Sequence, residues 1–361
     1  MEKIFLAGLQ MVPGIGNSRI KKLIDYFGSA QQAWQASKHD LLLCKNIDAT
    51  ICNNLILLRE KIDILNLADK WFKQDIKLCH ISERDYPGLL RNVYNPPDLF
   101  FYRGILPKSE KLIAIVGSRQ STAYGKNAAN MLGRELAAAD ICVVSGAARG
   151  IDTAAHKGAL TTGKTIAVLG CGVDISYPPE NRYLLDQISD CGTVISEYAP
   201  GTTPHAAFFP ARNRIISGLS AGVVVVEAAE RSGALITTEH ALDNGRDVFA
   251  IPGSIFSDAS KGVHKLIKQG AKLIDSIDDI LEEYNWACKQ NAGELSLSKD
   301  ETVIYNTLNF DNPLTVEEIV VKTNLTIPVI SYILLQLELR GLVAEHCPQY
   351  YVRAIKGVLG E

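Results

Sequence analysis

The chain has 361 residues, of which 47% are hydrophobic and 21% are charged, and its formal net charge is −3. These values are typical of a globular protein long enough for two or three domains, and they exclude a disordered or fibrous chain. The near-balanced charge also excludes a strongly basic nucleic-acid binder, so any DNA contact must depend on a few well-placed cations.

The spacing of the cysteines and the length of the apolar runs indicate the cellular compartment of the protein. The eight cysteines form no C-x-x-C pair, and one lies in the apolar run 141–144. This pattern predicts reduced core thiols in a cytoplasmic protein, without disulfides or a zinc site. No run of eighteen apolar residues and no signal peptide is recognisable, so we expect no membrane span. The histidines show no metal-ligand spacing, and we expect neither metal nor cofactor.

Residues 1–70 predict a helical head. Apolar residues recur at helical spacing over 18–26 and again over 53–71. The segment Val12-Pro-Gly-Ile-Gly16 precedes the first of these stretches and is similar to the hairpin of a helix-hairpin-helix module, whose glycines expose N–H groups to a DNA phosphate. Two interpretations stay open, a phosphate contact and a hairpin kept for packing alone.

Residues 71–287 predict an α/β domain. Short apolar runs rich in branched residues alternate with helical segments, and the run at 193–196 is the weakest of them. The strands are predicted at 112–116, 141–144, 165–169, 222–226, 247–251 and 193–196, and the helices at 125–139, 151–160 and 232–243. This alternation predicts a Rossmann-like, doubly wound and mainly parallel sheet.

The loops after the first three strands are rich in small residues. They read Gly117-Ser-Arg119, Ser145-Gly-Ala-Ala-Arg-Gly-Ile-Asp152 and Gly170-Cys-Gly-Val-Asp174. Ligands of such sheets bind at the carboxyl ends of the strands, where small residues let a phosphate approach the backbone. Arg119 and Arg149 would supply charge, so we expect an anion-binding ridge. Segment 208–214 adds Arg212 and Arg214 beside two phenylalanines, as in single-strand binders.

Segment 158–165 matches the Walker A pattern, and 223–227 is similar to its Walker B partner. A phosphate loop must leave a strand and open a helix, whereas this segment ends a helix and opens a strand. We therefore disfavour an ATPase. His156 lies four residues after Asp152, which we interpret as a structural contact rather than an acid–base pair. Ser118 and Ser145 have no base nearby in sequence, and no catalytic residue is expected.

Residues 288–299 predict a linker and residues 300–361 a winged-helix domain. The second helix of its helix-turn-helix is predicted at 328–340, and the wing hairpin at 342–345 and 350–353. Arg340 is the only cation of that helix, and Glu317, Glu318 and Glu338 are close by in sequence. A helix that reads a DNA groove needs cations or amides, so we expect a protein contact or a structural role.

The combined motifs resemble the DNA-processing protein A (DprA or Smf) family over residues 75–285. The shared pattern includes Gly117-Ser-Arg119, Ser145-Gly146-x-Ala148-x-Gly150-Ile-Asp152 with His156, Leu169-Gly170-x-Gly172-x-Asp174-x-x-Tyr177-Pro178-x-x-Asn181, Ser196-Glu197, Phe209-Pro210-x-Arg212-Asn213-Arg214-x-Ile216-Ser217, Val226-Glu227-Ala228, and Gly245-Arg246 to Pro252-Gly253.

The resemblance implies a protein that binds single-stranded DNA during natural transformation and helps to load the recombinase RecA. It also implies a homodimer formed through the Rossmann-like domain, and no enzymatic activity. The head is similar to SAM-like and helix-hairpin-helix accessory domains of that family, and the tail is similar to its winged helix.

Carried onto this sequence, the resemblance gives Arg119 the role of phosphate clamp. The expected DNA-binding residues are Gly117, Ser118, Arg119, Ser145, Gly146, Lys164, Arg212, Asn213 and Arg214. Lys164 is the weaker candidate, because it is predicted at the opposite edge of the sheet. For dimerisation the amphipathic stretch 263–274 offers His264, Leu266 and Ile267, for which a core role is the alternative.

A nucleotide hydrolase similar to the phosphoribohydrolases is the competing function. Glu227 and Glu239 would be its catalytic residues. That class needs a P-G-G-x-G-T loop, whereas the corresponding stretch reads Glu227-Ala-Ala-Glu-Arg-Ser-Gly-Ala234.

Overall fold

The computed structural model describes residues 1–286, 297–310 and 312–353. The chain folds into two compact units, Met1–Ala287 and Cys288–Glu361, which are described separately. Positions 288–296 of the predicted linker lie outside the described residues. Lys299, the last residue of that prediction, begins a helix.

Six helices form the head at the start of the first unit. They are α1 (Glu2–Gln10), α2 (Asn17–Phe27), α3 (Ala30–Gln35), α4 (Lys38–Leu43), α5 (Ala49–Lys61) and α6 (Ile64–Lys73). The helical pattern over 53–71 is therefore divided between two helices, and Asp63 caps the second by accepting from Leu65 N and Asn66 N. The head packs into one apolar cluster with Leu99 and Phe101 of the neighbouring sheet. The limits of the domains stay a prediction.

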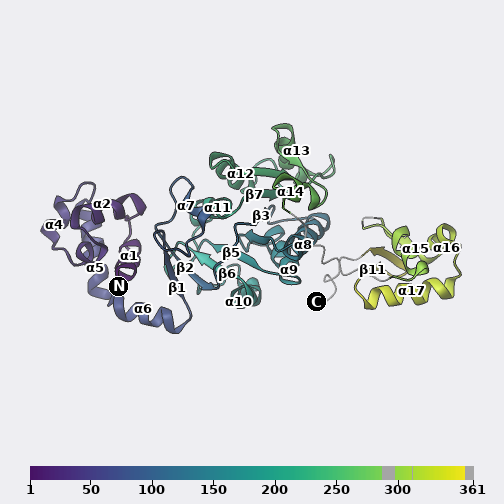
Figure 1. Cartoon of the computed structure of the whole chain (residues 1–361), viewed down its shortest axis with the longest axis horizontal. Coiled ribbons are helices and arrows are strands. Elements are labelled where there is room, and N and C mark those ends of the chain that lie inside the picture. Colours follow the sequence, from purple (N-terminus) through teal and green to yellow (C-terminus); the bar gives the residue numbers. More distant parts are fainter. Residues whose placement is uncertain (287–296, 311, 354–361) are drawn as a thin grey trace. The chain divides into compact units, whose positions relative to one another are not determined.

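A nine-stranded sheet forms the centre of the first unit (Figure 1). Its strands are β1 (Lys77–His80), β2 (Leu99–Gly104), β3 (Leu112–Val116), β4 (Cys142–Ser145), β5 (Thr165–Leu169), β6 (Thr193–Ser196), β7 (Gly222–Val225), β8 (Asp247–Ala250) and β9 (Lys272–Leu273). Their order is β1-β2-β6-β5-β4-β3-β7-β8-β9, in which the pairs from β6 to β9 are parallel and β2 pairs antiparallel with β1 and β6. The predicted doubly wound, mainly parallel sheet is confirmed.

Helices cover both faces of this sheet. They are α7 (Gly88–Arg91), α8 (Ala123–Ala138), α9 (Ile151–Leu160), α10 (Arg182–Cys191), α11 (Phe208–Leu219), α12 (Ala234–Asp243), α13 (Lys261–Lys268) and α14 (Asp278–Glu283). One apolar cluster joins β3, β7 and β8 to α8, α9 and α14, and another joins the opposite face to α11, α12 and α13. Strands buried on both faces explain the continuous apolar runs in the sequence.

The second unit is a small helix-and-hairpin fold. It contains α15 (Lys299–Thr307), β10 (Leu314–Thr315), α16 (Val316–Thr323), α17 (Ile327–Leu339), β11 (Val343–Cys347) and β12 (Tyr350–Arg353). Its three strands pair in the order β10-β12-β11. The predicted second helix and wing hairpin are both present.

Membrane-spanning length was assessed for the described residues. No single helix among them is both long and apolar enough to cross a bilayer. The bent pair α16 and α17, with 110° between its two parts, passes the same test by length and composition.

His156 lies in the core of the sheet but not against the residue expected. Its Nδ1 lies 2.7 Å from Thr165 Oγ1, whose hydroxyl donates to Val143 O at 2.7 Å. Nδ1 therefore carries the proton, and within the described residues the buried Nε2 has no partner. The predicted contact between His156 and Asp152 is wrong, because Asp152 is engaged by the loop before α9. Burial lowers the pKa of His156 from 6.5 to about 3.

This burial predicts a stability loss in acid. The unfolded state takes up a proton at His156 below pH 6.5, whereas the folded state does so only near pH 3. The contribution of His156 to the free energy of unfolding is therefore fully present above pH 6.5. Between pH 6.5 and about pH 3 the free energy of unfolding falls by up to about 1.4 kcal/mol for each unit by which the pH decreases. His156→Gln should flatten this slope, measured by urea unfolding followed by tryptophan fluorescence, since all three tryptophans lie in the first unit. Parallel slopes for variant and wild type would contradict the prediction.

Candidate nucleic-acid interface

The strand order reverses between β3 and β7. From β3 the chain proceeds through β4, β5 and β6 to one side and returns to β7 and β8 on the other. Ligands of open parallel sheets bind in the crevice at such a point, outside the carboxyl ends of the strands. The loops after β3, β4, β5 and β7 all meet there.

The loop after β4 holds an anion of its own. Asp152, in the first turn of α9, accepts from Gly146 N at 3.2 Å and from Ala148 N at 3.3 Å. The carboxylate is buried, and its burial raises the pKa of Asp152 against the lowering effects of Arg212 and the two amides. The Gly146 amide that we expected to bind phosphate is therefore already bonded. Ser145 is equally unavailable, because it is fully buried and donates to Ile115 O at 2.6 Å.

The helix after β3 is capped by a second buried carboxylate. Glu227, two residues after the end of β7, accepts from Thr122 N at 2.9 Å and from the Thr122 hydroxyl, at the N-terminus of α8. Its backbone oxygen accepts from Ser118 N at 2.8 Å. The Ser118 amide is thus committed, whereas the Ser118 hydroxyl accepts from Gln120 N and keeps its proton for an outside acceptor.

Arg212 points into the protein and not into solvent. It is 4% exposed, and Nη1 donates to Val168 O on β5. A Cβ at Gly146 would clash with that Nη1, so the absence of a side chain there leaves the space that the arginine occupies. Burial lowers the pKa of Arg212 to about 10, with Asp152 acting in the opposite direction. Desolvation and packing thus fix the Arg212 guanidinium at the inner wall of the cleft, and its predicted contact with DNA stays a prediction.

Arg119 lies outside this buried layer, against aromatic rings. Its guanidinium lies 5.1 Å from the centre of the Phe209 ring, and the Phe209 and Tyr177 rings are 5.2 Å apart. Arg119 is exposed, and within the described residues no hydrogen bond or ion pair holds its guanidinium. Gly170 makes room for the ring, because a Cβ there would lie 3.0 Å from Phe209 Cδ1. These three side chains define the Arg119–Phe209–Tyr177 cluster.

The cluster borders a cleft of about 700 Å³. Its wall also contains Gly117, Ser118, Gln120, Asn213, Ser232 and Thr237. Asn213 also lines the cleft, with Nδ2 donating to Gly233 O at 3.3 Å, and its contact with DNA stays a prediction. Tyr177 was not among the residues predicted for the site. The signal available was an aromatic residue following a glycine-rich loop at the carboxyl end of β5.

Two further predicted cations are neutralised by carboxylates. Arg214 donates to both oxygens of Glu197 and to Asn95 O at 2.8 Å. Arg149 pairs with Glu180. Both arginines therefore add little net charge, and Arg119 is left as the exposed, unpaired cation of this cleft within the described residues.

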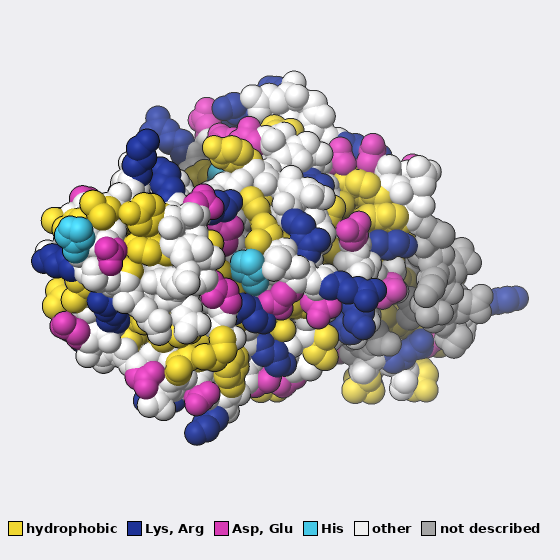
Figure 2. Space-filling model, turned by 60° about the vertical axis from the view of Figure 1, so that its left-hand side comes forward, with side chains coloured by type: hydrophobic (Ala, Val, Ile, Leu, Met, Phe, Trp, Pro, Cys, Tyr) yellow, Lys and Arg dark blue, Asp and Glu magenta, His cyan; other side chains and the backbone are white. Residues whose placement is uncertain are grey.

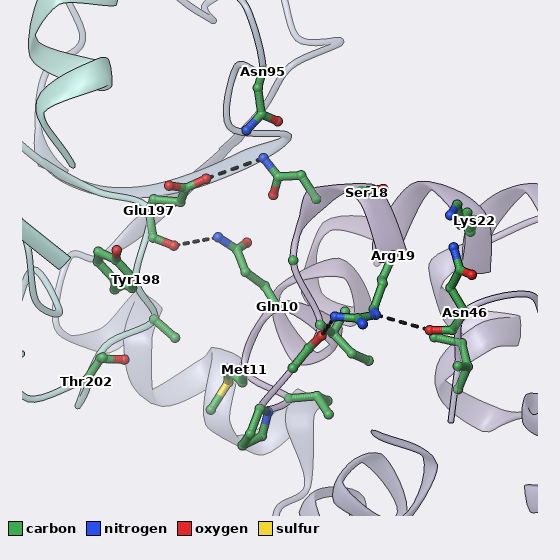
Figure 3. Close-up of a pocket in the computed structure, with 18 of the residues that line it drawn as sticks. Gln10, Met11, Ser18, Arg19, Lys22, Asn46, Asn95, Glu197, Tyr198 and Thr202 are labelled. Atoms are coloured by element: carbon green, nitrogen blue, oxygen red, sulfur yellow. Dashed lines mark hydrogen bonds between the residues drawn. The ribbon is translucent and has the colours of Figure 1, made fainter. Parts of the chain in front are cut away.

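Arg214 lines a second cleft, of about 1,120 Å³, between the sheet and the head. Figure 3 shows Glu197 on the sheet side of this cleft. Gln10 Nε2 donates to Glu197 O at 2.5 Å, and Asn17 Nδ2 lies 3.4 Å from Glu197 Oε1. The hairpin 12–16 lines the head side, where Arg19 donates to Gly14 O and to Asn46 O. These bonds give the hairpin a structural role. A DNA contact at this hairpin stays a prediction.

Other predicted residues lie away from the cleft. Lys164 immediately precedes β5, so it lies at the amino edge of the sheet, opposite the cluster. The amphipathic stretch 263–274 is not one element, because α13 ends at Lys268 and β9 begins at Lys272. On α13, Leu266 is buried in the core, Ile267 packs beside it, and His264 Nε2 lies 3.0 Å from Gly253 O. The burial of Leu266 supports the core alternative for that residue.

The features considered for enzymatic function are explained structurally. Segment 158–165 ends α9 and opens β5, as predicted. Glu227 caps α8, whereas Glu239 is exposed on α12. Across the described residues no group of three His, Cys, Asp or Glu side chains is placed to hold a metal ion.

Charge on one face of the molecule is mixed in sign. On the face shown in Figure 2, basic and acidic side chains are interspersed rather than gathered into separate fields. This face therefore offers no broad basic field to a polyanion. Fold and site together define a Rossmann-like protein whose open cleft is bordered by an exposed arginine and two aromatic rings.

Comparison with known proteins identifies the family. Residues 77–285 match the family described as DNA recombination-mediator protein A, and residues 289–347 match the DprA winged helix domain. The chain therefore belongs to the DNA recombination-mediator protein A family, and its second unit is a winged helix.

Several relatives and structures are similar along most of their length. DNA processing protein DprA of Streptococcus pneumoniae is 43% identical, over 76% of this chain and 95% of that protein. The Bacillus subtilis DprA protein is 46% identical over 58% of this chain and 72% of that protein. The S. pneumoniae crystal structure superposes with a TM-score of 0.67 at 39% identity, over 78% of this chain and 98% of that chain. A structure describing the single-stranded DNA binding mode of the Helicobacter pylori protein gives 0.52 at 28% identity, over 58% and 95%.

Because Asp152 is buried and bonded, we expect its removal to lower the free energy of unfolding substantially. Asp152→Ala leaves the Gly146 and Ala148 amides without an acceptor and Arg212 without its neighbouring charge, so unfolding free energy should fall by about 3–5 kcal/mol. Asp152→Asn keeps one acceptor oxygen and should lose less. Urea unfolding by tryptophan fluorescence measures both.

Inorganic phosphate provides a control for this interpretation. Because an anion can take the place left by the carboxylate, phosphate should stabilise Asp152→Ala more than wild type. Equal stability of Asp152→Ala and wild type would show that the loop does not depend on its carboxylate.

Proposed function

We propose that this protein binds single-stranded DNA, without sequence preference, in the cleft at the carboxyl ends of β3 and β7. The observation that carries the proposal is the Arg119–Phe209–Tyr177 cluster, an unpaired guanidinium over one ring with a second ring beside it. Single-strand binders combine backbone neutralisation with base stacking in this way. The H. pylori relative, whose title describes single-stranded DNA binding, supports the same class of ligand.

In this proposal the cleft binds the strand through two kinds of contact, to phosphates and to bases. Arg119 and the Ser118 hydroxyl bind a phosphate, and Phe209 and Tyr177 stack against bases. Gly117 and Asn213 line the path of the strand. Arg212 acts from inside, by fixing the loop that carries Gly146.

The cellular role proposed is that of a cytoplasmic recombination mediator without enzymatic activity. It protects incoming DNA during natural transformation and assists the loading of RecA, acting as a homodimer. Family membership supports the mediator role. The use of both carboxylate oxygens of Glu227 in capping α8 argues against the competing nucleotide hydrolase.

Removing Arg119 tests the site. Arg119→Ala should weaken binding of a labelled oligothymidylate about tenfold or more, corresponding to about 1.4 kcal/mol. It should also reduce the slope of log affinity against log salt by about 0.7, the value for one lost phosphate contact on a single strand. Fluorescence anisotropy at several salt concentrations, with duplex DNA as competitor, provides both numbers.

Two variants separate charge from stacking. Phe209→Leu should lose about 1–3 kcal/mol of affinity while the salt slope stays constant. Arg149→Ala is the matched control, because Glu180 already neutralises that arginine. If Arg119→Ala kept both affinity and slope, the assigned cleft would be wrong. Failure of the wild type to bind any single strand would refute the proposed function itself.

A further inference from the structure

The winged-helix unit has a helix that is apolar on two opposite sides. On α17, Ile330, Ile333, Leu334 and Leu337 are buried in the core of the unit. Pro328, Tyr332, Leu335 and Leu339 lie on the other side, within an arc of about 60° at 100° per residue. We call these four residues the α17 stripe. Figure 1 shows α17 along one edge of the unit, with α15 and α16 on its other side.

The side chains of the α17 stripe are apolar but largely exposed to solvent. Tyr332 is 64% exposed, Leu335 52% and Leu339 74%. A helix that is apolar all round is normally buried, and a contiguous exposed apolar surface marks an interaction site. The α17 helix contains no Lys or Arg, so the stripe does not suit a nucleic acid.

The spacing of the stripe is symmetric. Its intervals along the chain are four, three and four residues, so the order reads the same from either end. A two-fold axis that pairs α17 with an antiparallel copy places Pro328 against Leu339 and Tyr332 against Leu335. In such a two-fold symmetric contact each of these residue pairs occurs twice, once on either side of the axis. Intervals of three and four residues are also those of packed antiparallel helices.

Charge agrees with this pairing. In the antiparallel arrangement Glu338 lies beside the first turn of the other α17. That turn contains no acidic residue, and Thr326 at its N-cap makes no side-chain capping bond. A carboxylate near a helix N-terminus is stabilising. Arg340, just beyond the helix, is already paired with Glu301 at 2.9 Å.

We propose that the α17 stripe binds the α17 stripe of a second copy of this chain. Two helices of 13 residues bury far less than the roughly 1,200 Å² of a stable interface. The contact therefore forms between chains held at high local concentration, as on one strand of DNA. In that respect alone it rests on the proposed function.

Photo-crosslinking of the full chain tests the contact. Tyr332 is replaced by p-benzoylphenylalanine, and isotopically light and heavy copies are mixed over a concentration series, with and without oligothymidylate. The expected product is a light–heavy peptide pair that joins position 332 to residues 335–339. Leu335→Lys and Leu339→Lys should each lower its yield severalfold. The same replacement at the exposed Tyr350 of β12 is the control and should give no such pair.

The outcomes separate this inference from the proposed function. Links confined to one copy, links to other surfaces, or no light–heavy pair at any concentration would each overturn the stripe contact. DNA binding is measured by anisotropy on the same samples. A light–heavy pair in a protein that binds no oligothymidylate would support the contact and refute the DNA-binding proposal.

Discussion

Two buried carboxylates set the chemistry of the carboxyl edge of the sheet. Asp152 bonds to the amides of the loop before α9, and Glu227 caps α8. Helix N-termini at this edge are where Rossmann-like proteins bind the phosphates of a nucleotide. Because the protein supplies its own anions there, a ligand must bind outside this layer, along the rim of the crevice.

Helix α11 connects the buried layer to the rim. Its first turns send Arg212 inward over Gly146 and Phe209 outward over Gly170. The small residues of these loops thus admit side chains of α11 as close neighbours. Phe209 in turn supports the guanidinium of Arg119 at the surface. One helix therefore fixes the loops from inside and presents an aromatic surface to a ligand.

The distribution of cations explains how a chain of net charge −3 can interact with a polyanion. Arg212 is buried, Arg214 and Arg149 are paired with Glu197 and Glu180, and Arg119 stays available. Exposed charge pairs attract little, whereas an unpaired cation beside rings combines charge with stacking. Association of several chains, through the proposed dimer or the α17 stripe, would multiply a contact that is modest in a single copy.

The sequence alone determined six of the nine strands of the sheet, β3 to β8. The limits of β3, β5, β6 and α9 were predicted to the residue, because strands buried on both faces and a helix between glycine-rich turns leave strong local patterns. It also located the loops of the site, and it placed Lys164 at the far edge from strand direction alone. The order and spacing of the motifs were sufficient to predict the family.

Only the tertiary structure decided what individual side chains do. Arg212 bonds to Val168, 44 residues away, and His156 lies against Thr165 rather than Asp152. Tyr177 belongs to the site because its ring packs against Phe209 of α11, a residue far from it in the sequence. Local periodicity records whether a position faces a core, but it does not record which distant partner fills the space. Desolvation and packing across the fold decide between a surface cation and a buried one.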